Sequence, residues 1–528
     1  MAGGAGGRSW LVWGAGVWLL GPVSLLVWGV SQAPSTPSLP AVAQTETGQR
    51  SVAAAPTPES GAGQQIPACS ERIGSFAPVE GTPGQQAVER LVNLSEWGVG
   101  LGNREASSAQ VPASGEGIDP DTTGRWAELN RRLERLEEQL RQQRSRAADR
   151  PTTQLTGMIH LDRYWTGEDS EFRQAYGALP DGVVFRRVRI GLQGTYGAWD
   201  YRIIPEFAAA GRPSLFDVFV GWNDLPALGH VRVGHFAEPF GLEQTSSIRG
   251  INTLERSVLS EIYGRRRRVG IMFFDTWDEQ RGTWALGIFR SDNDVFGDDI
   301  AQRQFRSAVT GRLTRLVWYD EEDNWLELLH LGVSYSARAP KNRQVQFQAR
   351  PEDRFGAASP NLPILIDTGP IPATFYQLLV GEALWIHGPF SMQGEYLLVP
   401  VSTRQYGAVY FFAWYVQASL VLTGEHRQYR RDTAVLDSVI PRRDFLRREN
   451  GQWFVGPGAW ELIVRFSQAD LNDGGIEGGR ITGITLGVAW YLNPYMRIYA
   501  NYIQTHPTPA NAKPGIGHIF GVRTALEF

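Results

Sequence analysis

The sequence predicts an all-β protein: a transmembrane antiparallel β-barrel of about sixteen strands, preceded by a signal segment, a disordered linker and a short coiled-coil helix. Three observations support this fold class. Apolar and polar residues alternate repeatedly from residue 154 onward, every second connection between these segments is short, and the last strand ends on the aromatic Phe528. Strands of this kind present an apolar face to lipid and a polar face to a water-filled lumen.

The N-terminal segment is typical of export. Residues 10–30 are apolar throughout and follow Arg8, and the small-x-small sequence at 41–43 is a suitable cleavage site. We therefore predict a signal peptide over residues 1–43. An uncleaved membrane anchor is the alternative, because about twenty apolar residues can span a bilayer. Either segment would direct the remainder of the chain across the inner membrane.

Residues 44–120 and 121–150 differ sharply in composition. The first segment is rich in Pro, Gly, Ser, Ala and Gln without a sustained period, which predicts a flexible low-complexity linker. The second carries a heptad seam made of Trp126, Leu129, Leu133, Leu136 and Leu140. This seam predicts a short coiled coil, which would join chains already held together elsewhere because so short a seam is marginal alone. A single amphipathic helix lying on another surface is the alternative.

Residues 154–528 read as strand, turn, strand to the end, and we predict that they form the barrel. The predicted strands lie near 154–165, 183–195, 199–209, 214–223, 229–237, 266–275, 283–290, 304–318, 325–337, 373–386, 389–400, 408–423, 459–468, 481–492, 495–505 and 518–528. The apolar run at 406–423 is interpreted as a strand rather than a membrane helix. Its apolar residues recur with a period of two, and it is rich in β-branched and aromatic residues.

The lengths of the connections give an independent check. If both ends of the barrel lie on the periplasmic side, every second connection should be short. The short ones fall at 196–198, 224–228, 276–282, 319–324, 387–388 and 493–494. Longer loops are expected on the opposite side at 166–182, 238–265, 291–303, 338–372, 469–480 and 506–517. One periplasmic connection, residues 424–458, breaks the rule by its length.

A lumen enclosed by about sixteen strands is filled with water unless loops fold into it. Because of their length, the segments 238–265, 338–372 and 424–458 are the candidates for a constriction. Arginines in a narrow pore favour anions through their charge and through bidentate hydrogen bonds to phosphate or carboxylate. The candidate pore and anion-binding residues are Arg187, Arg189, Arg202, Arg232, Arg312, Arg338, Arg343, Arg430, Arg431, Arg442, Arg443 and Arg465. Arg268, Arg306 and Arg523 would extend the set along the wall.

A structural role is the alternative for each of these arginines. Barrel interiors and loops often pair arginine with aspartate and glutamate, which makes the barrel rigid. The run from Arg265 to Arg268 also suits the outer rim, where cations meet anionic lipid headgroups.

The sequence offers no catalytic or cofactor-binding motif. It lacks HExxH, CxxC and Gly-x-Ser-x-Gly, and its eight histidines are scattered. The acidic cluster at 292–299 hints at calcium, but it lacks the glycine and the terminal glutamate of an EF-hand, so a solvated loop is preferred. The net charge of −4 gives no general attraction to nucleic acid. We predict a protein that is not an enzyme and needs no cofactor or metal.

Several motifs carry a resemblance to a known family. They are RPSLFDVFVGW (212–222), VRVGHFAEPFGLEQTSS (231–247), LERS (254–257), LTGE (422–425), GAWELIVRFS (458–467) and GVAWYLNP (487–494). With them the chain resembles the phosphate-selective porin O and P family, in a form like that seen in planctomycetes. The resemblance implies a sixteen-stranded trimeric porin with inward-folded loops, one of them an unusually long periplasmic loop.

We therefore expect an outer-membrane channel for passive diffusion of small hydrophilic solutes, with phosphate-like anions favoured. Its expected partners are outer-membrane lipid, small anionic solutes and two further copies of the chain in a homotrimer, with no nucleic acid. The coiled coil and the linker would lie in the periplasm. Two other classes remain as alternatives: a secreted β-sandwich that binds carbohydrate or mediates adhesion, and an enzyme built on an outer-membrane barrel.

Overall fold

The computed structural model describes residues 128, 131–135, 138, 151–208, 213–264, 267–291, 307–322, 325–354, 362–509 and 513–528. The predicted signal peptide (1–43) and linker (44–120) lie outside the described residues. Within the predicted helix 121–150, the described residues are helical. Leu133 of the predicted seam is 56% exposed. The coiled coil itself stays a prediction.

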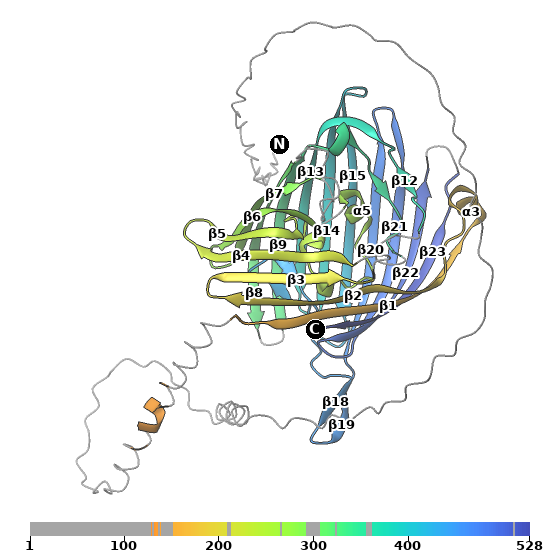
Figure 1. Cartoon of the computed structure of the whole chain (residues 1–528). Helices are drawn as coiled ribbons and strands as arrows, with labels where there is room; N and C mark the ends of the chain where they lie inside the picture. Colours follow the sequence, from red (N-terminus) through yellow and green to blue (C-terminus); the bar gives the residue numbers. More distant parts are fainter. Residues whose placement is uncertain are drawn as a thin grey trace, which may run out of the picture. The chain divides into compact units, whose positions relative to one another are not determined.

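Sixteen long strands form one closed antiparallel barrel (Figure 1). The described part of this sheet has seventeen strands, of which β10 (Gln344–Val345) is a two-residue addition beside β13. The sixteen barrel strands are β1 (Gln154–Glu168), β2 (Gly182–Tyr196), β3 (Trp199–Glu206), β4 (Ser214–Leu225), β5 (Gly229–Ala237), β6 (Arg267–Trp277), β7 (Gly282–Arg290), β8 (Ser307–Glu322), β9 (Trp325–Arg338), β13 (Ile371–His387), β14 (Phe390–Thr403), β15 (Ala408–Val421), β20 (Ala459–Asp473), β21 (Ile476–Tyr491), β22 (Met496–Thr508) and β23 (Gly517–Glu527). The predicted fold class is confirmed.

The barrel closes by pairing its first strand with its last. β1 and β23 form an antiparallel ladder along β1 from Met158 to Glu168. Just beyond it, the backbones of Gly157 and Phe528 exchange two hydrogen bonds of 2.8 and 3.0 Å. The Phe528 ring covers Gly157 so closely that a Cβ there would come within 2.3 Å of the ring. This closure removes the free sheet edges and contradicts the alternative of a secreted β-sandwich.

The two faces of the barrel differ as the alternation predicts. On β23, Phe520 is 43% exposed on the outer face, whereas Arg523 is 1% exposed on the inner face. On β1, Ile159 is 40% exposed and its neighbour His160 is fully buried. An outer surface covered with exposed apolar side chains is suited to hydrocarbon rather than water. None of the helices in the described residues is long and apolar enough to cross a membrane.

The predicted loop at 469–480 is wrong. β20 and β21 continue through this segment and turn tightly at Gly474 and Gly475, whose φ angles are positive. Gly478 and Gly479 fall within the segment that was predicted as a loop. These glycines lie within β21, where a Cβ would come within 3.1 Å of Thr368 at Gly478 and within 3.0 Å of Ile366 at Gly479. They allow a neighbouring loop to approach the strand, rather than ending it.

The remaining elements belong to four connections. Between β1 and β2 lies α3 (Ser170–Tyr176). The first inward loop (238–265) contains α4 (Leu242–Thr245), η2 (Ile248–Gly250) and α5 (Val258–Tyr263). The second inward loop (338–372) contains η4 (Lys341–Arg343), β10, β11 (Gln348–Ala349) and β12 (Ile366–Asp367). The periplasmic connection (424–458) contains β16 (Tyr429–Arg430), β17 (Val435–Leu436), β18 (Leu446–Glu449) and β19 (Gln452–Val455).

An apolar core lies between the inward loops and the inner face of the barrel. Leu254 and Leu259 of the first inward loop and Phe347 of the second belong to the same buried cluster as Val399 of β14 and Phe411 of β15. Figure 1 shows α5 inside the ring of strands, in agreement with its contacts to β15 and β20. The interior of the barrel is therefore partly filled by these loops.

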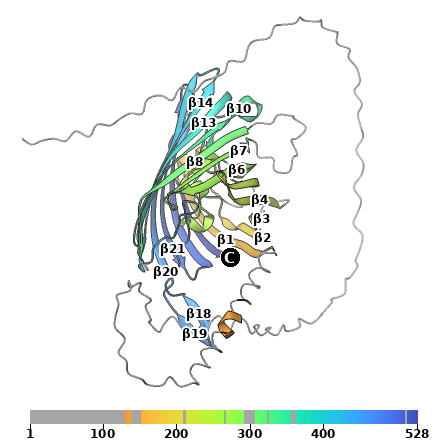
Figure 2. The ribbon, with the colours of Figure 1, turned by 90° about the vertical axis from the view of Figure 1, so that its left-hand side faces the viewer.

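Only the first part of the periplasmic connection enters the barrel. The hairpin formed by β18 and β19 extends away from the ends of β20 and β21 (Figure 2). Every residue of these two short strands is exposed. The expectation that segment 424–458 folds inward therefore holds for the residues before this hairpin and is wrong for the hairpin itself.

Candidate functional site

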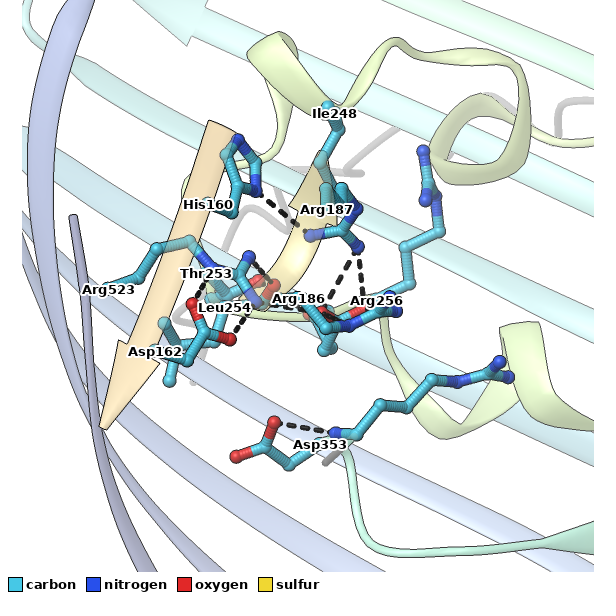
Figure 3. Close-up of polar contacts among 12 residues, drawn as sticks. His160, Asp162, Arg186, Arg187, Ile248, Thr253, Leu254, Arg256, Asp353 and Arg523 are labelled. Atoms are coloured by element: carbon cyan, nitrogen blue, oxygen red, sulfur yellow. Dashed lines mark hydrogen bonds and ion pairs between the residues drawn. The ribbon is translucent and has the colours of Figure 1, made fainter. Parts of the chain in front are cut away.

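The first inward loop is fixed to the barrel wall through Glu255. Its carboxylate lies 2.8 Å from Arg186 Nε, 3.0 Å from Arg187 Nη2 and 2.9 Å from Arg523 Nη2. Arg523 also holds Asp162 of β1 at 2.7 Å (Figure 3). Burial disfavours the ionised carboxylate, but the three guanidiniums outweigh this effect and hold the pKa of Glu255 well below its usual range.

A β-bulge explains why two adjacent arginines reach this carboxylate. Neighbours on a regular strand point to opposite faces. The pairing of β1 with β2 shifts by one residue between His160 and Leu161, and this bulge allows both Arg186 and Arg187 to turn inward. The sequence analysis named Arg187 and missed Arg186, because a bulge leaves no periodic signal.

A second attachment holds the start of the first inward loop. Glu238 accepts from Arg338 of β9 at 2.7 Å and is paired with Arg268 of β6 at 2.5 Å. Arg338 also donates to the Tyr263 hydroxyl at 2.9 Å, which ties α5 to the same wall. Two of the predicted wall arginines thus hold a loop carboxylate.

Arg465 of β20 holds both inward loops at once. Its guanidinium lies 2.7 Å from Glu352 of the second inward loop. It also donates to Thr253 Oγ1 at 3.0 Å and to the Glu255 carbonyl at 3.1 Å. Glu352 in turn accepts from the backbone N–H of Val258 at 2.7 Å. This predicted pore residue is 1% exposed and acts as a structural link.

The periplasmic connection meets the first inward loop inside the barrel. Arg427 donates to the Gly250 carbonyl and, at 2.9 Å, to Gln393 of β14. The Leu436 N–H donates to Ser246 Oγ at 3.3 Å. Gly250 is essential to this contact, since a Cβ there would lie 2.1 Å from the Leu436 carbonyl oxygen. Segments that enter from opposite ends of the barrel thus touch, and a constriction of the pore at this contact stays a prediction.

Arg312 of β8 also fixes the periplasmic connection to the barrel wall, on strands close to β14. Its guanidinium binds Glu382 of β13 at 2.6 Å and donates to the carbonyls of Thr433 and Ala434 at 3.3 and 2.9 Å. Arg312 is 6% exposed. Like Arg187, Arg338 and Arg465, it is engaged by protein groups.

The inner faces of β3 and β5 carry two arginines that form no hydrogen bond with a carboxylate. Arg202 and Arg232 lie 3.9 Å from Asp217 and 4.0 Å from Asp200, beyond hydrogen-bonding distance. Their side chains are 40% and 26% exposed. The Nε atom of each is buried without a partner among the described residues. These two guanidiniums retain hydrogen-bonding capacity that the protein does not use.

Aromatic rings surround these less engaged arginines. Arg232 lies over the Phe219 ring at 4.1 Å, and Arg202 lies over the same ring at 5.6 Å. Nearby, the Phe216 ring is contacted by Arg189 at 3.4 Å and by Arg267 at 3.3 Å. Both of these last arginines are also held by carboxylates: Arg189 pairs with Glu206 at 2.6 Å and Arg267 with Asp217 at 2.8 Å.

The other predicted arginines lie in loops. Arg343 is exposed. Arg430 is paired with Asp432 at 2.9 Å, with both side chains about half exposed, and Arg431 packs on the Tyr319 ring at 4.8 Å. Arg442 and Arg443 are exposed just before the β18–β19 hairpin. The structure places Arg430 close enough to the wall residue Arg202 for their charges to interact, and Arg306 lies outside the described residues.

Asp353 of the second inward loop is a buried acid in this network. Its Oδ1 accepts from the Arg354 N–H at 2.6 Å (Figure 3), whereas Oδ2 has no hydrogen-bond partner among the described residues. Burial, together with the charges of Glu255 and Asp162, raises the pKa of Asp353 to about 7. A carboxyl group at the junction of both inward loops thus titrates close to neutral pH.

Among the described residues, no group of three or more His, Cys, Asp or Glu side chains could hold a metal ion. The acidic cluster at 292–299, considered as a calcium site in the sequence, lies outside those residues.

Solved structures of a porin and of a channel are similar to this chain at low sequence identity. The anion-selective porin from Comamonas acidovorans is 13% identical, with a TM-score of 0.42, and covers 71% of this chain and 100% of its own. The outer-membrane channel DcaP of Acinetobacter baumannii is 10% identical, with a TM-score of 0.44, and covers 72% and 97%.

Sequence comparison identifies the family. Porin O of Pseudomonas aeruginosa is 27% identical over 388 residues, which cover 67% of this chain and 83% of that protein. An uncharacterized protein of Caulobacter vibrioides is 25% identical over 332 residues, covering 61% and 62%. The family model described as phosphate-selective porin O and P matches residues 166–528, well over half of the chain. The chain therefore belongs to the phosphate-selective porin O and P family and is an outer-membrane β-barrel porin, not an enzyme.

Proposed function

We propose that this porin lets small hydrophilic anions, phosphate among them, diffuse passively through the barrel as part of a homotrimer. The observation that carries the anion preference is the pair Arg202 and Arg232. Both face the interior, both are partly exposed, and neither forms a hydrogen bond with a carboxylate. Cations with free donors beside a narrow passage attract anions and repel cations.

A third cation strengthens the field at this wall. Arg430 of the periplasmic connection lies close enough to Arg202 for their charges to interact. Its partner Asp432 is exposed, so that ion pair is screened by water. The opposing charges are Asp217, which lies 3.9 Å from Arg202 but is bound to Arg267 through 2.8 and 3.2 Å contacts, and Asp200, which lies 4.0 Å from Arg232.

The anion preference is tested by replacing Arg202 and Arg232 together with glutamine and measuring reversal potentials across planar bilayers in a KCl gradient. The reversal potential should move toward the potassium potential. The Arg202→Lys, Arg232→Lys variant should keep the wild-type sign, because it keeps both charges. Arg404→Gln, in the exposed turn between β14 and β15, is the matched control. An unchanged reversal potential in the glutamine variant would remove this pair from the proposed anion path.

The trimer is supported by the family resemblance and by the predicted seam at 121–150. Detergent-extracted full-length protein should have the mass of three chains in light scattering, and loss of residues 121–150 should weaken that assembly without dissolving it. A single-chain mass for the full-length protein would contradict the trimer.

A further inference from the structure

The interior wall formed by β4 to β7 carries an apolar surface that a water-filled lumen does not require. Phe219, Phe236, Met272 and Phe289 form a buried cluster, with Phe274 packed against it. The outer positions next to them carry the exposed Val220, Val233, Leu286 and Ile288, so the cluster lies on the inner face. Interior faces of porins are polar as a rule.

Arg232 lies at the centre of this apolar surface. Its guanidinium lies 4.1 Å from the ring centre of Phe219, 5.0 Å from that of Phe274 and 5.7 Å from that of Phe236. Arg202 approaches Phe219 as well, at 5.6 Å. We call Arg202, Arg232, Phe219, Phe236 and Phe274 the arginine–phenylalanine wall.

The pairing of β4 with its two neighbouring strands sets the position of the two charges. Arg202 pairs across the sheet with Phe219, and Arg232 pairs with Gly221. Because Gly221 has no side chain, nothing on that strand separates Arg232 from the Phe219 ring. A Cβ at Gly221 would also come within 2.1 Å of Asp200 Oδ1. The sheet thus places a flat ring between two cations at its inner surface.

From this arrangement we propose that the arginine–phenylalanine wall is a binding subsite for organic anions that join a carboxylate to a flat apolar ring. The carboxylate would accept from Arg202 and Arg232, whose Nε atoms have no partner among the described residues. The ring of the solute would lie against Phe274, which is only partly buried, whereas the buried Phe219 packs against Arg232. Inorganic phosphate can use the charges but gains nothing from the rings, so the subsite distinguishes two kinds of anion.

The groups facing the subsite leave it cationic. Asp200 lies 4.0 Å from Arg232, and Asp217 is held by Arg267. His230 stacks on Phe274 at 5.2 Å and is hydrogen-bonded to Asn223 at 3.0 Å. Arg430 adds a further positive charge near Arg202. Counted with their partners, four guanidiniums face three carboxylates at this wall, which leaves one net positive charge to favour an anion: Arg202, Arg232, Arg267 and Arg430 against Asp200, Asp217 and Asp432.

This inference rests on the proposed anion path, and its experiment separates the two. Full-length porin in planar bilayers carries a chloride current, and potassium benzoate or potassium acetate is added as a blocker. Both are monovalent carboxylates, so only the ring differs. Benzoate should reduce the current by half at a roughly tenfold lower concentration than acetate, the range expected from one ring stacking and one cation–π contact.

Removing the phenylalanine rings of the wall then tests whether the stronger block by benzoate arises there. The double variant Phe219→Leu, Phe274→Leu removes both rings but keeps an apolar side chain at each position, and it should bring benzoate to within about threefold of acetate. Phe520→Leu, on the outer face of β23, is the matched control and should behave as wild type. The folded-barrel band on a semi-native gel verifies each variant.

The outcomes distinguish the two proposals. If benzoate and acetate block the wild type equally while chloride is still preferred over potassium, the ring subsite is wrong and the anion path stands. If benzoate blocks more strongly but the Phe219→Leu, Phe274→Leu variant does not differ from Phe520→Leu, the subsite is not at this wall and the inference fails. If the wild type shows no preference for chloride, both proposals fail.

Discussion

Two walls of the same barrel carry inward-facing arginines that differ in burial and in whether they bind a carboxylate. On β2, β20 and β23, Arg187, Arg465 and Arg523 are at most 3% exposed and bind carboxylates of the inward loops. On β3 and β5, Arg202 and Arg232 are partly exposed and lie about one ångström too far from the nearest carboxylate for a hydrogen bond. The strand position of an arginine therefore does not determine its role. What decides it is whether a loop brings an acid to it.

The difference has an energetic consequence. A buried carboxylate held by several guanidiniums cannot lose its charge without leaving unpaired cations in a low-dielectric interior, which costs about 3–5 kcal/mol. A partly exposed ion pair contributes less than about 1 kcal/mol. The first wall should therefore govern stability and loop position, and the second should govern which solutes pass.

The largest effect should come from Glu255→Gln. This change leaves Arg186, Arg187 and Arg523 without their shared charge, so we expect a loss of about 3–5 kcal/mol of stability and faster proteolysis of the first inward loop. The temperature at which the folded band disappears on a semi-native gel measures the first effect. Arg202→Gln is the control from the other wall and should cost less than about 1 kcal/mol. Equal losses for the two variants would contradict the division between the walls.

A smaller, pH-dependent effect should come from Asp353→Asn. The pKa of Asp353 is about 7 in the folded protein and 3.8 ordinarily. The folded state therefore binds more protons between these values, so the contribution of this residue to stability falls as pH rises from about 4 to about 7, by up to about 4 kcal/mol. The second inward loop of the wild type should be held less firmly at pH 8 than at pH 5, and this difference should be smaller in the variant.

The checks for Asp353 are proteolysis of the second inward loop and thermal loss of the folded band, each at pH 5 and pH 8. Glu255 does not mask the result, because its pKa is lowered and it stays ionised across this interval. A pH profile that is the same in wild type and Asp353→Asn would show that another group produces it.

The sequence predicted the barrel well because period-two alternation records which face of each strand meets lipid. The C-terminal strand is an example: Phe520 and Phe528 on one face and Arg523 on the other can be assigned without a structure. The long connection 424–458 was also evident from its length. These features depend on residues that are close together in the chain.

The ion-pair partner of each arginine could not be predicted from the sequence in the same way. Glu255 and Arg523 are 268 positions apart, and no local pattern shows that they meet. Arg186 was missed because of a bulge, and Arg465 was assigned to the pore because nothing near it in sequence revealed Glu352 as its partner. Ion pairs across a closed barrel are set by loop paths, which alternation does not encode.

The contact between the first inward loop and the periplasmic connection, at Gly250 and Leu436, offers a further test of how the loops are held in the barrel. Gly250→Val would place a side chain against the Leu436 carbonyl, 2.1 Å from the position of the new Cβ. The backbones must move apart, at an expected cost of about 1–3 kcal/mol, and single-channel conductance should change because the constriction is displaced. Gly381→Val is the control, since nothing lies within 4 Å of a Cβ there. Unchanged conductance in Gly250→Val would show that this contact does not limit the passage.

The smallest effect is expected from the loop arginines. Replacing Arg430, Arg431, Arg442 and Arg443 together with alanine removes four charges from the periplasmic connection. Arg442 and Arg443 are exposed near the β18–β19 hairpin, where water and salt screen them within about 10 Å, and Arg430 is already paired with Asp432. Only the charge of Arg430 near Arg202 should be felt in the passage. The chloride-to-potassium permeability ratio should therefore fall, but by less than in the Arg202→Gln, Arg232→Gln variant. If the fourfold variant shifted the reversal potential more than that pair does, the selective step would lie at the periplasmic connection, and the arginines of β3 and β5 would be secondary to it.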